Sequence, residues 1–215
     1  MGHLTTEQKG ERLWDVHQIK NLMGRYALYH NANEHMKTVE LFDLEREDCW
    51  LECGGMGVYK GPEGIRKFFY DWHLSLAGDG KGALNMHTLT SEVIEVAEDG
   101  QTAYAVWVSP GVETRRSEPN GDMVAMWIWG KYGVDFIKDK NGDWKFWHFT
   151  ITLDFLTDYD HSWVETESGK GVTVKNDGVP ANDGPNTFED DGYSLNKVWG
   201  MNPSMPMPYE SYDKK

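Results

Sequence analysis

Apolar side chains recur every three or four positions along the first part of the chain. From residue 11 to residue 31 they make a single stripe, which consists of Leu13, Val16, Ile19, Leu22, Met23, Tyr26 and His30. This spacing is typical of a helix that turns one side toward a core. Residues 11–31 are therefore predicted to form a helix, and Asn31 and Asn33 mark its end.

Two shorter helices and a strand are predicted next. A helix is expected from about residue 34 to residue 44, and a strand in the sequence CWLEC (49–53). Glycines around Met56 form a turn before the sequence VYKG. Pro62 suits the first turn of a third helix, which is expected to stop at Gly78.

From residue 84 the pattern changes to that of β-strands. Four runs are expected, at 84–97, 102–113, 123–137 and 143–156, and the sequences EDGQ and KDKNGD supply turns. Helices that come first and are followed by a strand meander indicate an α+β fold rather than a parallel α/β sheet.

The last part of the chain has a different composition. From residue 157 it is rich in Gly, Asn, Asp and Pro, which does not build a core of its own. Several large side chains within it would serve as anchors, namely Trp163, Phe188, Tyr193 and Trp199. We therefore expect an N-terminal extension at 1–10, one domain at 11–156, and an extended arm at 157–215 that wraps its own domain or a neighbouring subunit.

The charge balance narrows the choice of partners. The 215 residues include 21 Lys and Arg against 35 Asp and Glu, a net charge of −14. Nucleic acid and anionic membranes would be repelled, so neither is expected as a partner. No apolar stretch is long enough to span a membrane, and MGHLTTEQKGER lacks the pattern of a signal peptide. A cytoplasmic location is expected.

No metal or cofactor is expected from the sequence motifs. The histidines show neither HxH nor HExxH spacing, and the only two cysteines, Cys49 and Cys53, have no paired partner. We expect both cysteines to be buried thiols. The glycine pairs near residues 54–57 lie between strands, so they are turns rather than a phosphate loop.

Several short motifs, taken in order, carry a family resemblance. They are Arg25-Tyr26, the turn Gly57 to Gly61 before Gly64-Ile65, His87 at a strand start, Gly130 to Tyr132 with Asp135-Phe136, and Asp143 to Phe146. Together they resemble the SnoaL-like branch of the nuclear transport factor 2 superfamily over about two thirds of the chain. The resemblance implies a cone-shaped barrel of three helices on a strongly curved antiparallel sheet, enclosing a cavity and often forming a dimer.

The resemblance also implies a range of activities. Members include scytalone dehydratase, bile-acid dehydratases, ketosteroid isomerase, polyketide cyclases and diarylpropane lyases, alongside noncatalytic binding proteins. The enzymes share proton transfer without a cofactor. Because one fold serves many functions, the site is argued from its residues.

The first helix offers several candidate site residues. Tyr26, His30 and Asn33 lie along one helix face, where the fold would turn them toward the cavity mouth. Tyr26 is a candidate for proton transfer or an ordinary core tyrosine, and His30 and Asn33 are candidate substrate contacts. Asn31 stands where related dehydratases usually have an aspartate, so it is expected to orient substrate or hold developing negative charge.

His87 is the strongest candidate for acid–base chemistry. It matches the histidine that begins the first long strand in the dehydratases, where that residue is the general acid or base. An imidazole reaches both protonation states near neutral pH. The competing interpretation is a structural histidine with satisfied hydrogen bonds.

The final strand offers a second histidine. A two-residue period would put Trp144, Phe146, His148, Thr150 and Thr152 on one face. If the first two point inward, His148 and Thr150 face the cavity as well. His148 is then a second candidate catalytic residue, and Thr150 a candidate substrate contact.

The preceding strands supply candidate walls and a candidate carboxylate. Tyr132 and Asp135 belong to the family pattern, and Asp135 would replace the missing aspartate unless a bulge makes it structural. Trp107, Trp127 and Trp129 would line a site for an aromatic substrate, or pack in the core or at an interface. Ten Trp, ten Tyr and eight Phe in the whole chain suit each interpretation.

Three functions are compatible with these residues. The first is a cofactor-independent lyase, dehydratase or isomerase acting on a hydrophobic, aromatic or polycyclic small molecule, as a homodimer or higher homo-oligomer. The second is a noncatalytic binding or carrier module of the same fold. The third is a protein whose own aromatics close the cavity and which acts through its surface and arm.

Overall fold

The helices lie at the N-terminal end of the chain, as expected. The computed structural model describes residues 4–72, 81–116, 122–165, 181–189 and 192–214. Its helices are α1 (Thr6–Asn31), α2 (His35–Val39) and α3 (Gly61–Arg66), with α3 continued by the π-helix η1 (Lys67–Trp72) and a 3-10 turn, η3 (Tyr212–Lys214), at the C-terminus. Within the described ranges no helix is long and apolar enough to cross a membrane.

Two helix boundaries differ from the prediction. α1 begins five residues earlier than expected because the Thr5 side chain and the Gln8 side chain cap each other's backbone N–H groups. α2 is much shorter than the expected helix at 34–44. The predicted stop of the third helix at Gly78 lies outside the described residues.

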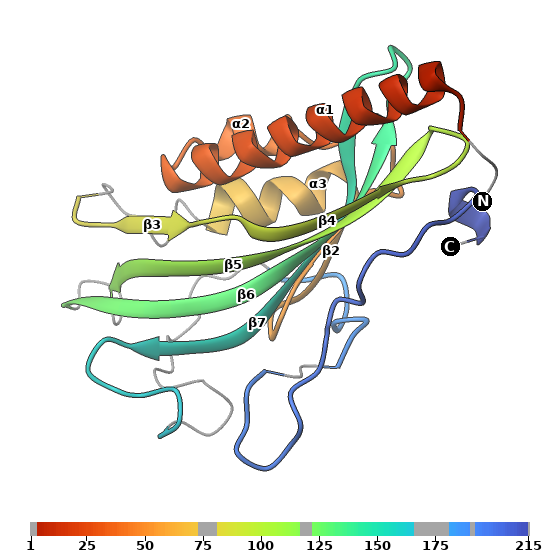
Figure 1. The fold of residues 1–215 in the computed structure, drawn as a ribbon. Coiled ribbons are helices and arrows are strands. Elements are labelled where there is room, and N and C mark those ends of the chain that lie inside the picture. The colour runs from red at the N-terminus through yellow and green to blue at the C-terminus, as the bar shows by residue number, and fades with distance from the viewer. Residues whose placement is uncertain (1–3, 73–80, 117–121, 166–180, 190–191, 215) are drawn as a thin grey trace.

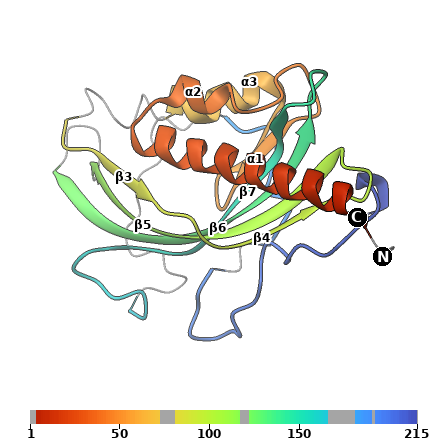
Figure 2. The same cartoon turned by 45° about the horizontal axis from the view of Figure 1, so that its top comes forward.

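The described strands form one curled sheet. They are β1 (Trp50–Cys53), β2 (Gly57–Lys60), β3 (Leu84–His87), β4 (Thr90–Val96), β5 (Thr102–Arg116), β6 (Met123–Lys138) and β7 (Trp144–Asp158). The order is β2-β1-β7-β6-β5-β3, with β4 also paired to β5. All pairings are antiparallel except that of β1 with β7. The predicted α+β class and the curved-sheet architecture are confirmed (Figures 1 and 2).

The concave face of the sheet holds an aromatic core beneath α1. The Tyr26 ring is 1% exposed and contacts four other rings at centroid distances of 4.8–5.9 Å, those of Phe69, Tyr132, Phe146 and Phe149. Edge-to-face aromatic contacts of this kind add to the burial of apolar area. The core therefore fixes α1 over the middle of the sheet, and it carries the C-terminal end of α1 toward β3 (Figure 1).

A β-bulge changes which side chains of β7 face inward. Asp135 pairs with His148 and Phe136 pairs with Phe146, so Trp147 has no opposite residue. An extra residue of this kind reverses the in–out alternation beyond it. The prediction that His148 and Thr150 share the inward face of Phe146 is therefore wrong, and both point to the outer face of the sheet.

The outer face of the sheet receives the C-terminal arm. The described parts of the arm, 181–189 and 192–214, run over this face (Figure 1). Thr187 donates hydrogen bonds from its N–H and its hydroxyl to the buried Glu52 carboxylate, at 2.9 Å each. Farther along, the Tyr209 hydroxyl lies 3.2 Å from Thr102 Oγ1. In this chain the arm thus wraps its own domain.

Glycines in the sheet make room for the arm. The φ of Gly57 is +89°, and a Cβ built there would lie 2.5 Å from Gly184 O. A Cβ on Gly133 of β6 would lie 2.5 Å from Cγ of the buried Pro203. The arm therefore docks where the sheet has no side chain.

Gly133→Ala is expected to loosen the arm without unfolding the domain, because its methyl group would occupy the position of the Pro203 ring. Limited proteolysis should cut residues 192–214 at least tenfold faster in this variant. Gly24→Ala is the matched control, since nothing lies within 4 Å of a Cβ at that position. Equal cleavage rates in Gly133→Ala and wild type would show that the docked arm does not depend on this contact.

The two cysteines are buried thiols, as predicted. Cys49 and Cys53 are both buried and are not joined in a disulfide. Burial, with nearby acidic side chains, raises the pKa of Cys49 to about 11. Its thiolate is therefore scarce at neutral pH, and no reaction is assigned to it.

Candidate functional site

A buried histidine–glutamate pair lies on the inner face of β3 and β5. His87 pairs with Gly111 in the β3–β5 register, and Glu113 is the next inward residue of β5. The ring crosses over Gly111, and His87 Nε2 lies 2.8 Å from Glu113 Oε1. The two side chains are only 9% and 3% exposed. A carboxylate in this position holds the imidazole in one orientation and stabilises its protonated form.

Sequence reasoning missed Glu113. The predicted strand ended at this residue, and the glutamate is followed by Thr-Arg-Arg, which resembles a solvated strand end. Its place beside His87 depends on the register of β3 against β5, which joins residues 26 positions apart. Glu113 could have been found by pairing the two predicted strands and counting the inward-facing positions from His87.

Asn31 holds the backbone of His87 rather than its ring. Asn31 Oδ1 accepts the His87 N–H at 3.0 Å, and Nδ2 lies 3.5 Å from the His87 carbonyl oxygen. Asn33 Oδ1 accepts a hydrogen bond from Asn85 Nδ2 at 3.0 Å. Both asparagines therefore join the end of α1 to β3. The predicted contacts of Asn31 and Asn33 with a bound molecule stay a prediction.

His30 lies between Tyr26 and the pair. Its ring is stacked on Tyr26 at 5.8 Å with an interplanar angle of 2°, and its centroid is 5.1 Å from that of His87. His35 follows at 6.5 Å from His30. Three imidazoles and one carboxylate thus gather at the C-terminal end of α1, although no group of three described His, Cys, Asp or Glu residues is arranged to hold a metal ion.

Tyr26 is a buried phenol that keeps its proton. Burial, together with the adjacent Tyr132, raises the pKa of Tyr26 well above its usual value of 10. A phenolate base at this position is therefore disfavoured near neutral pH. Tyr26 supports the His30 ring, and its contacts with Tyr132 and the surrounding rings match the core interpretation of this residue.

Stability is expected to fall steeply at alkaline pH. Burial raises the pKa of Tyr104, Tyr132 and Tyr209 to about 12 each, whereas an unfolded tyrosine ionises near 10. The stabilisation is complete below about pH 10 and is lost between pH 10 and 12, because the unfolded state releases its protons first. At about 1.4 kcal/mol per pKa unit, Tyr132 contributes roughly 3 kcal/mol and the two less buried phenols contribute less.

Urea unfolding followed by tryptophan fluorescence at pH 8 to 12 measures this loss. Tyr132→Phe should flatten the curve, because it removes the most deeply buried of the three ionising groups. A free energy of unfolding that stays constant up to pH 12 in the wild type would contradict the assignment of these phenols as buried acids.

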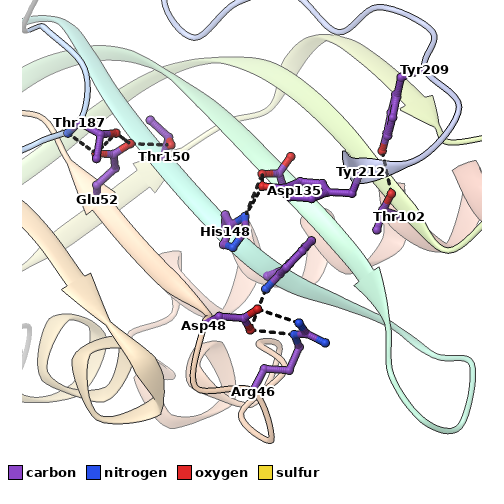
Figure 3. A network of polar contacts seen from close by, with 11 residues as sticks. Arg46, Asp48, Glu52, Thr102, Asp135, His148, Thr150, Thr187, Tyr209 and Tyr212 are labelled. Atoms are coloured by element: carbon purple, nitrogen blue, oxygen red, sulfur yellow. Dashed lines mark hydrogen bonds and ion pairs between the residues drawn. The ribbon is translucent and has the colours of Figure 1, made fainter. Parts of the chain in front are cut away.

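A second histidine–carboxylate pair lies on the opposite face of the sheet, under the arm (Figure 3). His148 Nδ1 lies 3.0 Å from Asp135 Oδ2, and the Tyr212 hydroxyl lies 3.1 Å from the same nitrogen. The His148 ring stacks on Trp50 at 4.8 Å. Asp135 thus pairs with His148 and not with His87. The prediction of these two residues as part of the inner site is wrong, because the bulge turns His148 outward.

The remaining predicted residues divide between the two faces. Thr150 donates a hydrogen bond to Glu52 at 3.1 Å on the outer face. Trp127 and Trp129 are also on the outer face, where they stack on Tyr159 and Phe155. Two of the predicted residues face inward and are buried, namely Trp107 and Tyr132. The structure therefore brings together His87, His30, Asn31 and Tyr26 of the predicted set, and it adds Glu113.

Known proteins with the same fold are similar to this chain. A family model for the SnoaL-like domain matches residues 11–150. No curated protein matches. Similar solved structures include a candidate scytalone dehydratase from Novosphingobium aromaticivorans DSM 12444, with 19% identity and a TM-score of 0.55 over 72% of this chain and 93% of that one.

Two further structures are similar over most of their length. An NTF2-like protein with a cystatin-like fold, from Novosphingobium aromaticivorans, is 22% identical, with a TM-score of 0.51 over 71% of this chain and 92% of that one. A hexachlorocyclohexane dehydrochlorinase, LinA-type3 from Novosphingobium barchaimii LL02, is 16% identical, with a TM-score of 0.53 over 72% and 96%. At these identities the similarity shows a shared fold.

Proposed function

The chain belongs to the SnoaL-like domain family, and from this we propose that it is a cofactor-free enzyme that transfers protons on a hydrophobic small molecule at the His87–Glu113 pair. The observation that carries the proposal is the buried 2.8 Å contact between the imidazole and the carboxylate. Buried charged groups are costly unless they are paired, so a buried pair of this kind points to a specific role.

The geometry assigns a role to each atom of the pair. The Glu113 carboxylate accepts the hydrogen of Nε2, which leaves Nδ1 of a neutral His87 as the base. That nitrogen lies over Gly111, 3.2 Å from the position of a Cβ built there. When Nδ1 takes a proton from carbon, the Glu113 carboxylate stabilises the imidazolium that results. Asn31 fixes the His87 backbone, so the base keeps its position during the transfer.

The surroundings of the pair favour an apolar substrate. Met126 and Ile128 of β6 are 2% and 6% exposed, and Ile128 lies beside the position where the His87 ring crosses Gly111. An aromatic or polycyclic compound, such as a lignin-derived diarylpropane or a steroid-like molecule, suits these side chains. The dehydratase and dehydrochlorinase named above support elimination as the kind of reaction. A cytoplasmic homo-oligomer without nucleic-acid or membrane partners completes the proposal.

One observation favours the carrier alternative. The Tyr26 hydroxyl is engaged by Tyr132, and aromatic rings surround Tyr26 on the inner face. A module that only binds a small molecule needs such packing and no free phenol. The carrier alternative predicts that a small molecule binds without any chemical change.

A paired binding and turnover experiment tests the proposal. Wild type is screened by thermal shift against diarylpropane diols, hydroxysteroids and phenolic polyketides, because a ligand of the native state raises the melting temperature. Each compound that binds is then incubated with wild type, His87→Gln and Glu113→Gln and followed by mass spectrometry. Product from wild type alone supports the enzyme. Binding without product from any of the three supports the carrier.

A further inference from the structure

A second imidazole lies against the His87–Glu113 pair. His30 is in the last turn of α1, is 8% exposed, and has its ring centroid 5.1 Å from that of His87. Its position is fixed, because the ring is parallel to that of Tyr26, which is itself held by four other aromatic rings. His30 and His87 therefore lie side by side on the inner face of the sheet.

The two imidazoles have different surroundings. His87 faces the Glu113 carboxylate, whereas His30 lies where the α1 backbone carbonyls end, a position that favours a cation. Two adjacent imidazolium ions would repel each other. Groups whose environments differ in this way divide the roles of acid and base between them.

We propose that His30 is a second proton-transfer residue, which protonates the leaving group while His87 removes the proton from carbon. The proposal rests on the proposed function and narrows its substrate to a compound with a hydroxyl leaving group, such as a β-hydroxy ketone. His87 Nδ1 takes the α-hydrogen, and the electron pair of that C–H bond forms the new C=C bond. The C–O bond breaks as its oxygen takes the His30 proton, and water leaves.

The leaving group distinguishes this role from a structural one. A hydroxyl leaves poorly as an anion and needs a proton, whereas chloride leaves without one. His30 therefore matters for dehydration and is dispensable for loss of chloride from the same carbon skeleton. A histidine that only supports the fold would affect both reactions equally.

Two matched probes test the proposal, 4-hydroxy-4-phenylbutan-2-one and 4-chloro-4-phenylbutan-2-one, which give the same enone product. His30→Gln is expected to lower kcat for the hydroxy ketone by roughly 10²-fold or more and kcat for the chloro ketone by less than about threefold. His87→Gln should lower both rates. His17→Gln, which changes an exposed histidine of α1, is the control and should lower neither. Equal losses for both probes, or none, in His30→Gln would overturn the role of His30.

Imidazole NMR tests the pair without turnover. The pH dependence of the His30 ring resonances should differ between wild type and His87→Gln, because the two rings are adjacent and each senses the charge of the other. If wild type converts neither probe, the proposed chemistry fails for this substrate class. His30 resonances that are the same in wild type and in His87→Gln overturn the proposal for His30 independently.

Discussion

His87→Gln is expected to lower turnover by roughly 10²- to 10⁴-fold, the range for loss of a positioned general base. Gln fills a similar volume but does not take a proton, and the Asn31 contact to the backbone of residue 87 is retained. Glu113→Gln should lower turnover less, by roughly 10- to 10³-fold, because the base remains and only its stabilising anion is removed. Steady-state rates on the compound identified by thermal shift measure both effects.

His148→Gln is the matched control for this prediction. It also breaks a buried histidine–carboxylate pair, at 3.0 Å from Asp135, but on the outer face of the sheet. It is expected to cost stability while leaving kcat within about threefold of wild type. An equal loss of turnover in His148→Gln and His87→Gln would mean that the loss reports damaged folding and not a missing base.

Lys131→Met is expected to lower the free energy of unfolding by about 3–5 kcal/mol. Lys131 and Asp154 form an ion pair on the outer face, and their side chains are 2% and 11% exposed. Trp199 of the arm covers the pair, with Lys131 Nζ 4.4 Å from its ring centroid. Removal of the cation alone leaves a buried carboxylate without its partner, which costs more than the pair contributes.

The double variant separates the cost of an unpaired carboxylate from the contribution of the ion pair itself. Lys131→Met with Asp154→Leu should recover most of the lost stability, because no unpaired charge remains. Lys20→Met, which breaks the exposed pair with Glu92, should change stability by about 1 kcal/mol or less. Urea unfolding measures all three. A Lys131→Met variant as stable as Lys20→Met would show that water reaches Asp154 beneath the arm.

Periodicity predicted the fold because α1, β5, β6 and β7 are all long elements. The apolar stripe of α1, from Leu13 to His30, spans about five turns of helix, and β5, β6 and β7 each run for 15 or 16 residues. Such runs leave few alternatives for which side is buried. Short elements were predicted less well, as α2 shows, because one or two turns depend on their tertiary contacts.

The site was predicted only where it depends on local sequence. His87, His30 and Tyr26 were found from helix spacing and a family motif, whereas Glu113 depends on the pairing of β3 with β5. His148 was misplaced because one bulged residue, Trp147, reverses the alternation of β7. A bulge of this kind leaves no distinct pattern in a single sequence.

Asn31 and Glu113 together show which element supplies the carboxylate beside His87. The family aspartate is absent from α1, and its place is taken by an amide that binds the His87 backbone. The carboxylate that contacts the imidazole comes instead from β5, on the other side of the ring.

Hydrogen–deuterium exchange of a ketone that has no leaving group tests proton abstraction most directly. 4-Phenylbutan-2-one is incubated in D₂O with wild type, His87→Gln and His148→Gln, and deuterium at the α-carbons is measured by mass spectrometry. We predict that wild type and His148→Gln exchange the α-hydrogens well above the buffer rate, and that His87→Gln exchanges them at the buffer rate. Exchange by wild type at the buffer rate, or equally fast exchange by His87→Gln, would contradict His87 as the base of this site.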